Sequence, residues 1–151
     1  MNLSYQEKLS ACSLVATLLV YGNYFLQSIF RWRNGSSNEG EVGRMVGTVV
    51  LLVIIEIAYQ IVVAVIDNPA PPMDERDRLI SARANRNAYG VLATGMGLVL
   101  TGILLSEGLS APSWSPFPLT PILLAQAVLA AMVAAEAVKD ATQLFYYRMG
   151  V

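Results

Sequence analysis

Four long apolar segments alternate with short polar or proline-rich stretches along the 151-residue chain. They cover residues 9–30, 45–66, 87–106 and 119–138, and each has at least 20 residues with no more than one charged side chain. An α-helix needs about 20 predominantly apolar residues to cross roughly 30 Å of hydrocarbon. The segments are rich in leucine and alanine and lack the alternation of barrel strands. The pattern therefore predicts an all-α integral membrane protein with four spans.

Helix start signals lie outside the apolar segments. Ser4 and Glu7 form a capping-box pattern ahead of the first span, and Asn38 and Glu41 form one ahead of the second. Asp74 is a suitable N-cap for the third helix, and Thr120 followed by Pro121 suits the start of the fourth. We expect one membrane domain, residues 1–151, with helices at about 5–31, 41–67, 74–107 and 120–147.

The connecting segments differ in basic residues. With four spans, the N-terminus, the segment 67–86 and the C-terminus share one side, which carries six Lys or Arg residues against three on the other. This bias predicts that both termini are cytoplasmic. Short connections favour an up-down-up-down four-helix bundle.

Composition removes several classes of function. Only 14% of residues are charged, and the formal net charge is −1. A nucleic-acid partner is not expected, because phosphate binding needs a basic footprint. The chain has no histidine and a single cysteine, Cys12, which argues against Cys/His metal sites and histidine-based catalysis. With no nucleophile–base set or phosphate-binding loop, we expect no enzyme, no metal and no cofactor.

Small residues recur at helical spacing in three of the spans. Gly43 and Gly47 form a GxxxG pattern, the third span contains four glycines, and the fourth contains an alanine series. Small side chains let membrane helices approach closely. We expect these positions to pack inside the bundle, and a dimer interface is the alternative.

Glu56 is an acid in the middle of the second span, about 15 Å from its inner end at 1.5 Å per residue. Gln60 lies one turn further along the same face, and Glu136 reaches a similar depth on the fourth helix with Lys139 and Asp140 beside it. Ionisable groups at such depth face the bundle interior and often mark ion pathways. These five residues are therefore candidates for a proton or cation site. The alternative is a hydrogen-bonded polar core at Glu56 with an ordinary helix end at 136–140.

The segment 67–86 is the main soluble feature on the expected cytoplasmic side. It contains a run of alternating charges, Asp74, Glu75, Arg76, Asp77 and Arg78. The run could dock a cytoplasmic partner, or it could be a solvated helix start whose arginines lie near anionic headgroups.

Three stretches carry a resemblance to a known family. They are Gln6-Glu7-Lys8; Asp74-Glu75-Arg76-Asp77-Arg78-Leu79-Ile80 with Arg83, Ala84, Tyr89 and Gly90; and Gln143-Leu144-Phe145-Tyr146-Tyr147-Arg148. In these the chain resembles a family of small, mostly uncharacterised bacterial four-span inner-membrane proteins with a DERDRLI-type motif. The resemblance implies four spans and a multi-pass location in the bacterial inner membrane, with no established activity and no functional residue.

Two main hypotheses for function follow. The first is a non-enzymatic accessory or regulatory protein that acts through contacts made by its cytoplasmic segment 67–86. The alternative is a small proton- or cation-coupled transporter or channel that uses Glu56 and Glu136. The expected partners are the lipid bilayer and either a second copy of the chain or a membrane or cytoplasmic protein. A membrane-embedded enzyme is a third, weaker hypothesis.

Overall fold

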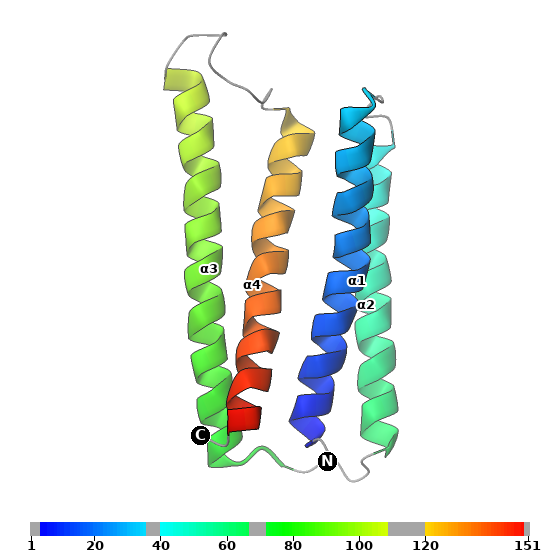
Figure 1. Ribbon diagram of the computed structural model, residues 1–151, viewed down its shortest axis with the longest axis vertical. Coiled ribbons are helices and arrows are strands. Elements are labelled where there is room, and N and C mark those ends of the chain that lie inside the picture. Colours follow the sequence, from blue (N-terminus) through cyan, green and yellow to red (C-terminus); the bar gives the residue numbers. More distant parts are fainter. Residues whose placement is uncertain (1–3, 36–39, 67–71, 109–119, 150–151) are drawn as a thin grey trace.

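The computed structural model describes residues 4–35, 40–66, 72–108 and 120–149. Within these ranges the regular elements are four helices, α1 (Tyr5–Arg33), α2 (Glu41–Ile66), α3 (Glu75–Gly108) and α4 (Pro121–Met149) (Figure 1). All four are long and apolar enough to span a membrane, as predicted. Their ends lie within two residues of those expected.

Three of the four capping predictions hold in the structure, and the fourth rests on Asn38, which lies outside the described residues. The Ser4 side chain accepts the Glu7 N–H, and the Ser4 N–H donates to the Glu7 carboxylate. Asp74 and Asp77 make the same reciprocal pair at the start of α3, with the Asp77 N–H 2.7 Å from Asp74 Oδ1. Thr120 Oγ1 accepts the N–H of Leu123 at the start of α4. Local sequence signals therefore determine where these helices begin.

The helices form an open bundle. Among the described residues, extensive packing joins α3 to α4, α4 to α1 and α1 to α2, and no comparable contact joins α2 to α3. In Figure 1, α3 and α2 accordingly lie at opposite edges. We call the end at which α1 and α3 begin the lower end, and the end at which α2 and α4 begin the upper end (Figure 1).

Hydroxyl side chains line the buried face of α1. The buried residues of this helix are Ser10, Ser13, Thr17, Tyr21 and Tyr24. Their spacing of three or four residues places them on one side of the helix. Large apolar side chains of α1 and α2, such as Leu19, Leu26 and Ile54, are exposed instead. In a membrane those residues face lipid, so the interior of this bundle is more polar than its surface.

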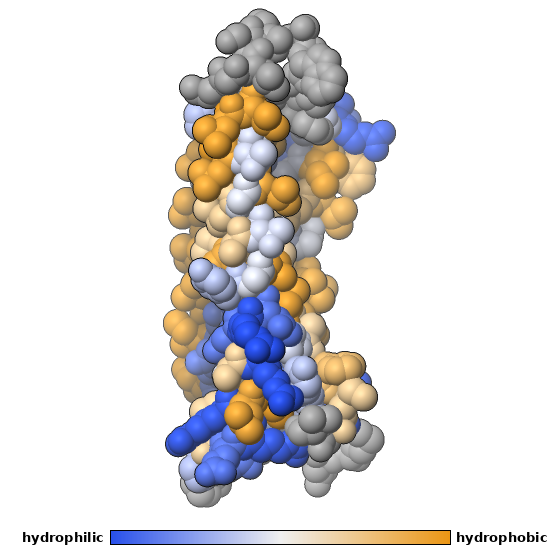
Figure 2. Space-filling view, turned by 90° about the vertical axis from the view of Figure 1, so that its left-hand side faces the viewer, coloured by the Kyte–Doolittle hydropathy of each residue, from blue (hydrophilic) through white to orange (hydrophobic). Residues whose placement is uncertain are grey.

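The surface of α3 changes character along its length. Figure 2 shows that hydrophilic residues gather on the lower part of the face on which α3 lies, with apolar residues above them. Arg78 and Arg86 are exposed in the first part of α3, whereas Leu98 and Leu104 are exposed further along. The helix thus joins a charged lower segment to an apolar span.

Small residues bring two helices together at one point. A Cβ atom added to Gly95 of α3 would lie 2.7 Å from the Cβ of Ala131 of α4. Five other glycines that were expected to pack inside the bundle have no atom within 4 Å of such a Cβ; they are Gly43, Gly47, Gly90, Gly97 and Gly102. For these five the expectation of close internal packing is wrong, because the space beside each Cβ position is open in the described structure.

Candidate functional site

Asp140 is the centre of a polar cluster between α1, α2 and α4. Its side chain is only 2% exposed. The Ser13 side chain of α1 lies close to Asp140 and also close to Tyr59 of α2. Within the part of the chain that the structure describes, Asp140 Oδ2 has no hydrogen-bond partner. We call Asp140, Ser13, Tyr59, Glu56, Glu136 and Lys139 the lower cluster.

The candidate residues from the sequence meet in this cluster, with one exception. Glu56 of α2 lies within electrostatic range of Glu136 and Lys139 of α4, and the Lys139 ammonium donates to the Glu136 carboxylate. Gln60, by contrast, is exposed.

The lower cluster holds three carboxyl groups and one ammonium group. Its formal charge is −2 if every group is ionised, and such a charge is costly at membrane depth. A proton bound by one of the carboxyl groups halves this charge and so lowers that cost. The arrangement is therefore suited to accept and release a small positive charge.

A second polar cluster ties α1, α2 and α4 together near the upper end. Glu41 is 7% exposed. Its carboxylate accepts hydrogen bonds from Ser28 Oγ at 2.6 Å, Arg44 Nη1 at 3.0 Å and Gln126 Nε2 at 3.1 Å. Gln126 also donates to the Tyr24 hydroxyl at 3.2 Å. We call these five residues the upper cluster, and in it the buried carboxylate has donors on three helices.

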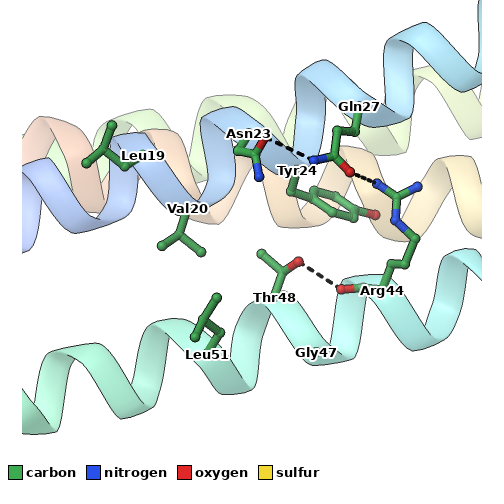
Figure 3. Close-up of a pocket in the computed structure, with 9 residues that line it drawn as sticks. All are labelled: Leu19, Val20, Asn23, Tyr24, Gln27, Arg44, Gly47, Thr48 and Leu51. Carbon is green, nitrogen blue, oxygen red and sulfur yellow. Dashed lines mark hydrogen bonds between the residues drawn. The ribbon is translucent and has the colours of Figure 1, made fainter.

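A cavity of about 360 Å³ lies beside the upper cluster between α1 and α2 (Figure 3). Its polar wall is a chain of hydrogen bonds: Arg44 Nη2 donates to Gln27 Oε1 at 2.9 Å, and Gln27 Nε2 donates to Asn23 Oδ1 at 3.0 Å. Gly47 and Leu51 of α2 form part of the remaining wall. Because these polar groups bond to one another, they offer no unpaired charge that could bind a ligand in the cavity.

The hydroxyl side chains of α1 form a row that runs from the lower cluster to the upper cluster. We call Ser10, Ser13, Thr17, Tyr21, Tyr24 and Ser28 the hydroxyl face. Ser13 belongs to the lower cluster, and Tyr24 and Ser28 belong to the upper cluster. Thr17 lies between them; it is fully buried, and its Oγ1 has no hydrogen-bond partner among the described residues.

Glu41 and the hydroxyl face are the features that sequence reasoning missed. Glu41 lies at a helix start, where an acid is expected for reasons of capping and the helix dipole. The hydroxyl residues are scattered singly through an apolar span. The sequence signal that could have revealed this face is the three- and four-residue spacing of its members, Ser10, Ser13, Thr17, Tyr21 and Tyr24.

The charged run at the start of α3 serves mainly to attach α3 to α4. The Tyr147 hydroxyl of α4 donates to Asp77 Oδ1 at 2.9 Å, and Arg76 Nη2 lies 3.5 Å from the Tyr147 carbonyl oxygen. Asp74 caps the helix. Only Glu75 and Arg78 of the five candidate docking residues are exposed without a contact of this kind.

Two further residues strengthen this attachment. The Arg83 guanidinium lies 5.3 Å from the centre of the Tyr146 ring, a cation–π geometry. Ile80, one turn before Ala84 on α3, is 2% exposed. These contacts hold the first turns of α3 against the end of α4.

Comparisons with protein-family models, curated proteins and solved structures find no match for this chain. Within the described ranges, no group of three or more Cys, Asp or Glu residues is arranged to hold a metal ion. The resemblance to the four-span family stays a prediction.

Proposed function

We propose that this protein is a multi-pass bacterial inner-membrane protein with an up-down-up-down order of spans and both termini in the cytoplasm. The excess of basic residues on one side supports this orientation. The start of α1 and the end of α4 lie together at the lower end (Figure 1), and the charged segment of α3 lies there too (Figure 2). In this orientation the lower cluster lies in the cytoplasmic half of the membrane.

Within this arrangement, the protein binds and transports a proton or a small monovalent cation through the lower cluster. The observation that carries the proposal is Asp140, which is 2% exposed and has an Oδ2 atom without a partner in the described structure. Buried polar atoms in folded proteins nearly always have a hydrogen-bond partner. A buried carboxyl oxygen that lacks one is a natural position for a proton or a cation.

The other groups of the lower cluster support a transport role. Glu56 and Glu136 come from different helices, and Lys139 offsets one of the three possible negative charges. Intramembrane acids are expensive to bury and mark ion pathways in many transporters. The hypothesis of a cytoplasmic docking segment stays a prediction; Asp74, Arg76 and Asp77 make internal contacts in the structure.

Flux measurements in liposomes test this proposal. Purified protein is reconstituted, and the uptake of protons, sodium and potassium is measured for the wild type, Asp140→Asn and Glu75→Gln. Asp140→Asn should lower the flux of the transported ion by roughly tenfold or more, because it removes the titratable group. Glu75→Gln is the matched control, since Glu75 is exposed at the start of α3. Wild-type protein that transports none of these ions would refute the proposal.

A role as a membrane-embedded subunit of a larger assembly is the second candidate. It is favoured by the uncovered glycines of α2 and α3, which leave room for a helix of another protein or a second copy. Cross-linking in native membranes tests it with Gly97→Leu, since Gly97 is exposed on α3 and a bulky side chain there should abolish a cross-linked product. Recovery of the wild type alone would count against this role.

A further inference from the structure

We propose that the hydroxyl face of α1 is a proton pathway between Glu41 of the upper cluster and Asp140 of the lower cluster. This inference rests on the proposed transport function and deepens it by naming the ion and its route. The route joins two buried carboxyl groups through side chains that can each accept and donate a hydrogen bond.

The hydroxyl face is long enough to carry a charge through most of a bilayer. Ser13 and Ser28 are fifteen residues apart, which corresponds to about 22 Å at 1.5 Å per residue. Ser10 extends the face toward the lower end, where it donates to Gln143 Oε1 at 2.6 Å. A hydrocarbon core is roughly 30 Å thick, so the face together with its two terminal carboxyl groups covers nearly all of it.

Thr17 differs from other threonines of this chain in the hydrogen bonding of its hydroxyl group. Threonines in membrane helices usually satisfy their hydroxyl by donating to the carbonyl four residues earlier. Thr48, Thr94 and Thr101 do so at 2.8, 2.9 and 2.8 Å. Thr17 is the fully buried threonine, yet its Oγ1 makes no such bond in the described structure. Its hydroxyl is therefore available to a partner inside the bundle.

Water is the partner that suits these open positions. Thr17 Oγ1 and Asp140 Oδ2 are both buried and unpaired, and buried water commonly bridges such groups. A proton added to the water or hydroxyl at one end moves along the chain because each oxygen accepts one proton and releases another. No hydroxyl changes its net protonation, and reorientation of the O–H groups resets the path.

Burial of the face from the outside makes the route selective for protons. Thr17 is 0% exposed and Tyr21 and Tyr24 are buried, so the face is not an open pore. A sodium or potassium ion would need a shell of oxygen ligands along the whole route, whereas a proton needs only a connected set of hydrogen bonds. Glu56 and Tyr59 of α2, Glu136 and Lys139 of α4 and Ser13 of α1 surround Asp140 where the proton arrives.

Conservative substitutions along the face test the route. Proton uptake by liposomes is driven by a potassium gradient with valinomycin and is compared for the wild type, Thr17→Val, Thr17→Ser and Tyr21→Phe. We expect roughly tenfold slower uptake for Thr17→Val and Tyr21→Phe, because each removes one relay oxygen. Thr17→Ser keeps the hydroxyl and should retain wild-type uptake. Thr94→Val is the matched control, since the Thr94 hydroxyl already bonds to its own helix.

The outcomes separate this inference from the proposed function. Wild-type uptake by both Thr17→Val and Tyr21→Phe, with loss in Asp140→Asn, would overturn the route and leave the transport function standing. Flux of sodium or potassium without proton flux would also overturn the route alone. A wild type that transports none of these ions would overturn both. Slower uptake in the hydroxyl variants with normal uptake in Thr17→Ser and Thr94→Val supports the pathway.

Discussion

Gly95 of α3 lies so close to Ala131 of α4 that a Cβ added to Gly95 would be 2.7 Å from the Cβ of Ala131. Such a separation is shorter than van der Waals contact, so the two helices can meet only with glycine at this position. The contact lies along the most extensive helix pair of the structure.

Gly95→Ala should therefore destabilise the protein in detergent by about 1–3 kcal/mol, the usual cost of forcing a methyl group into a packed interface. Gly97→Ala is the control, because nothing lies within 4 Å of its Cβ position. It should leave stability unchanged or raise it by up to about 1 kcal/mol through helix propensity. Thermal unfolding followed by circular dichroism measures both. Equal behaviour of the two variants would contradict the α3–α4 contact.

The attachment of α3 to α4 should depend on the hydroxyl of Tyr147. Tyr147→Phe removes its 2.9 Å hydrogen bond to Asp77, which should cost about 0.5–1.5 kcal/mol. Hydrogen exchange of the first turns of α3 should rise in this variant, because the start of the helix is then held less firmly. Tyr89→Phe is the control, since Tyr89 is 73% exposed. Unchanged exchange in Tyr147→Phe would contradict the role assigned to the charged run.

The upper cluster should stabilise the protein through the charge of Glu41. Glu41→Gln preserves the shape of the side chain but weakens its bonds with Ser28, Arg44 and Gln126. We expect a loss of about 1.5–3 kcal/mol in unfolding free energy, the range for hydrogen bonds to a charged group. Glu75→Gln, on the exposed start of α3, should change it by less than about 0.5 kcal/mol. A loss for Glu41→Gln no larger than for Glu75→Gln would argue against a buried network.

The orientation can be measured by cysteine labelling. In a Cys12→Ala background, Arg78→Cys and Asn34→Cys place single thiols at opposite ends of the molecule. We expect a membrane-impermeant maleimide added to intact spheroplasts to label the Asn34→Cys variant and not the Arg78→Cys variant, because the lower end faces the cytoplasm. The reverse pattern would invert the proposed topology and place the lower cluster in the outer half of the membrane.

Much of the architecture follows from local sequence. The spans are set by runs of apolar residues, and the helix starts by Ser4, Asp74 and Thr120, whose partners are three residues away. The meeting of Glu56 with Glu136 follows from their similar depth along α2 and α4, which run in the same direction. These features need no knowledge of which helix faces touch.

The remaining features depend on helix contacts that one sequence does not specify. Gly95 packs against a helix while Gly97 does not, although the two residues are alike in type and context. Serine, threonine and tyrosine side chains change the hydropathy of an apolar span only slightly. The hydroxyl face is therefore recognised only from the structure, in which α4 and α2 cover it. Glu41 could not be recognised as a buried network residue, because an acid at a helix start is already explained by capping.

The most direct test of the central claim is the rate of proton uptake by liposomes that contain equal amounts of wild-type protein or Asp140→Asn. We expect the wild type to acidify the vesicles well above the rate of protein-free liposomes, and Asp140→Asn to fall to that background rate. Equal uptake by the two proteins would contradict the account, because Asp140 would then have no part in moving charge through the bundle.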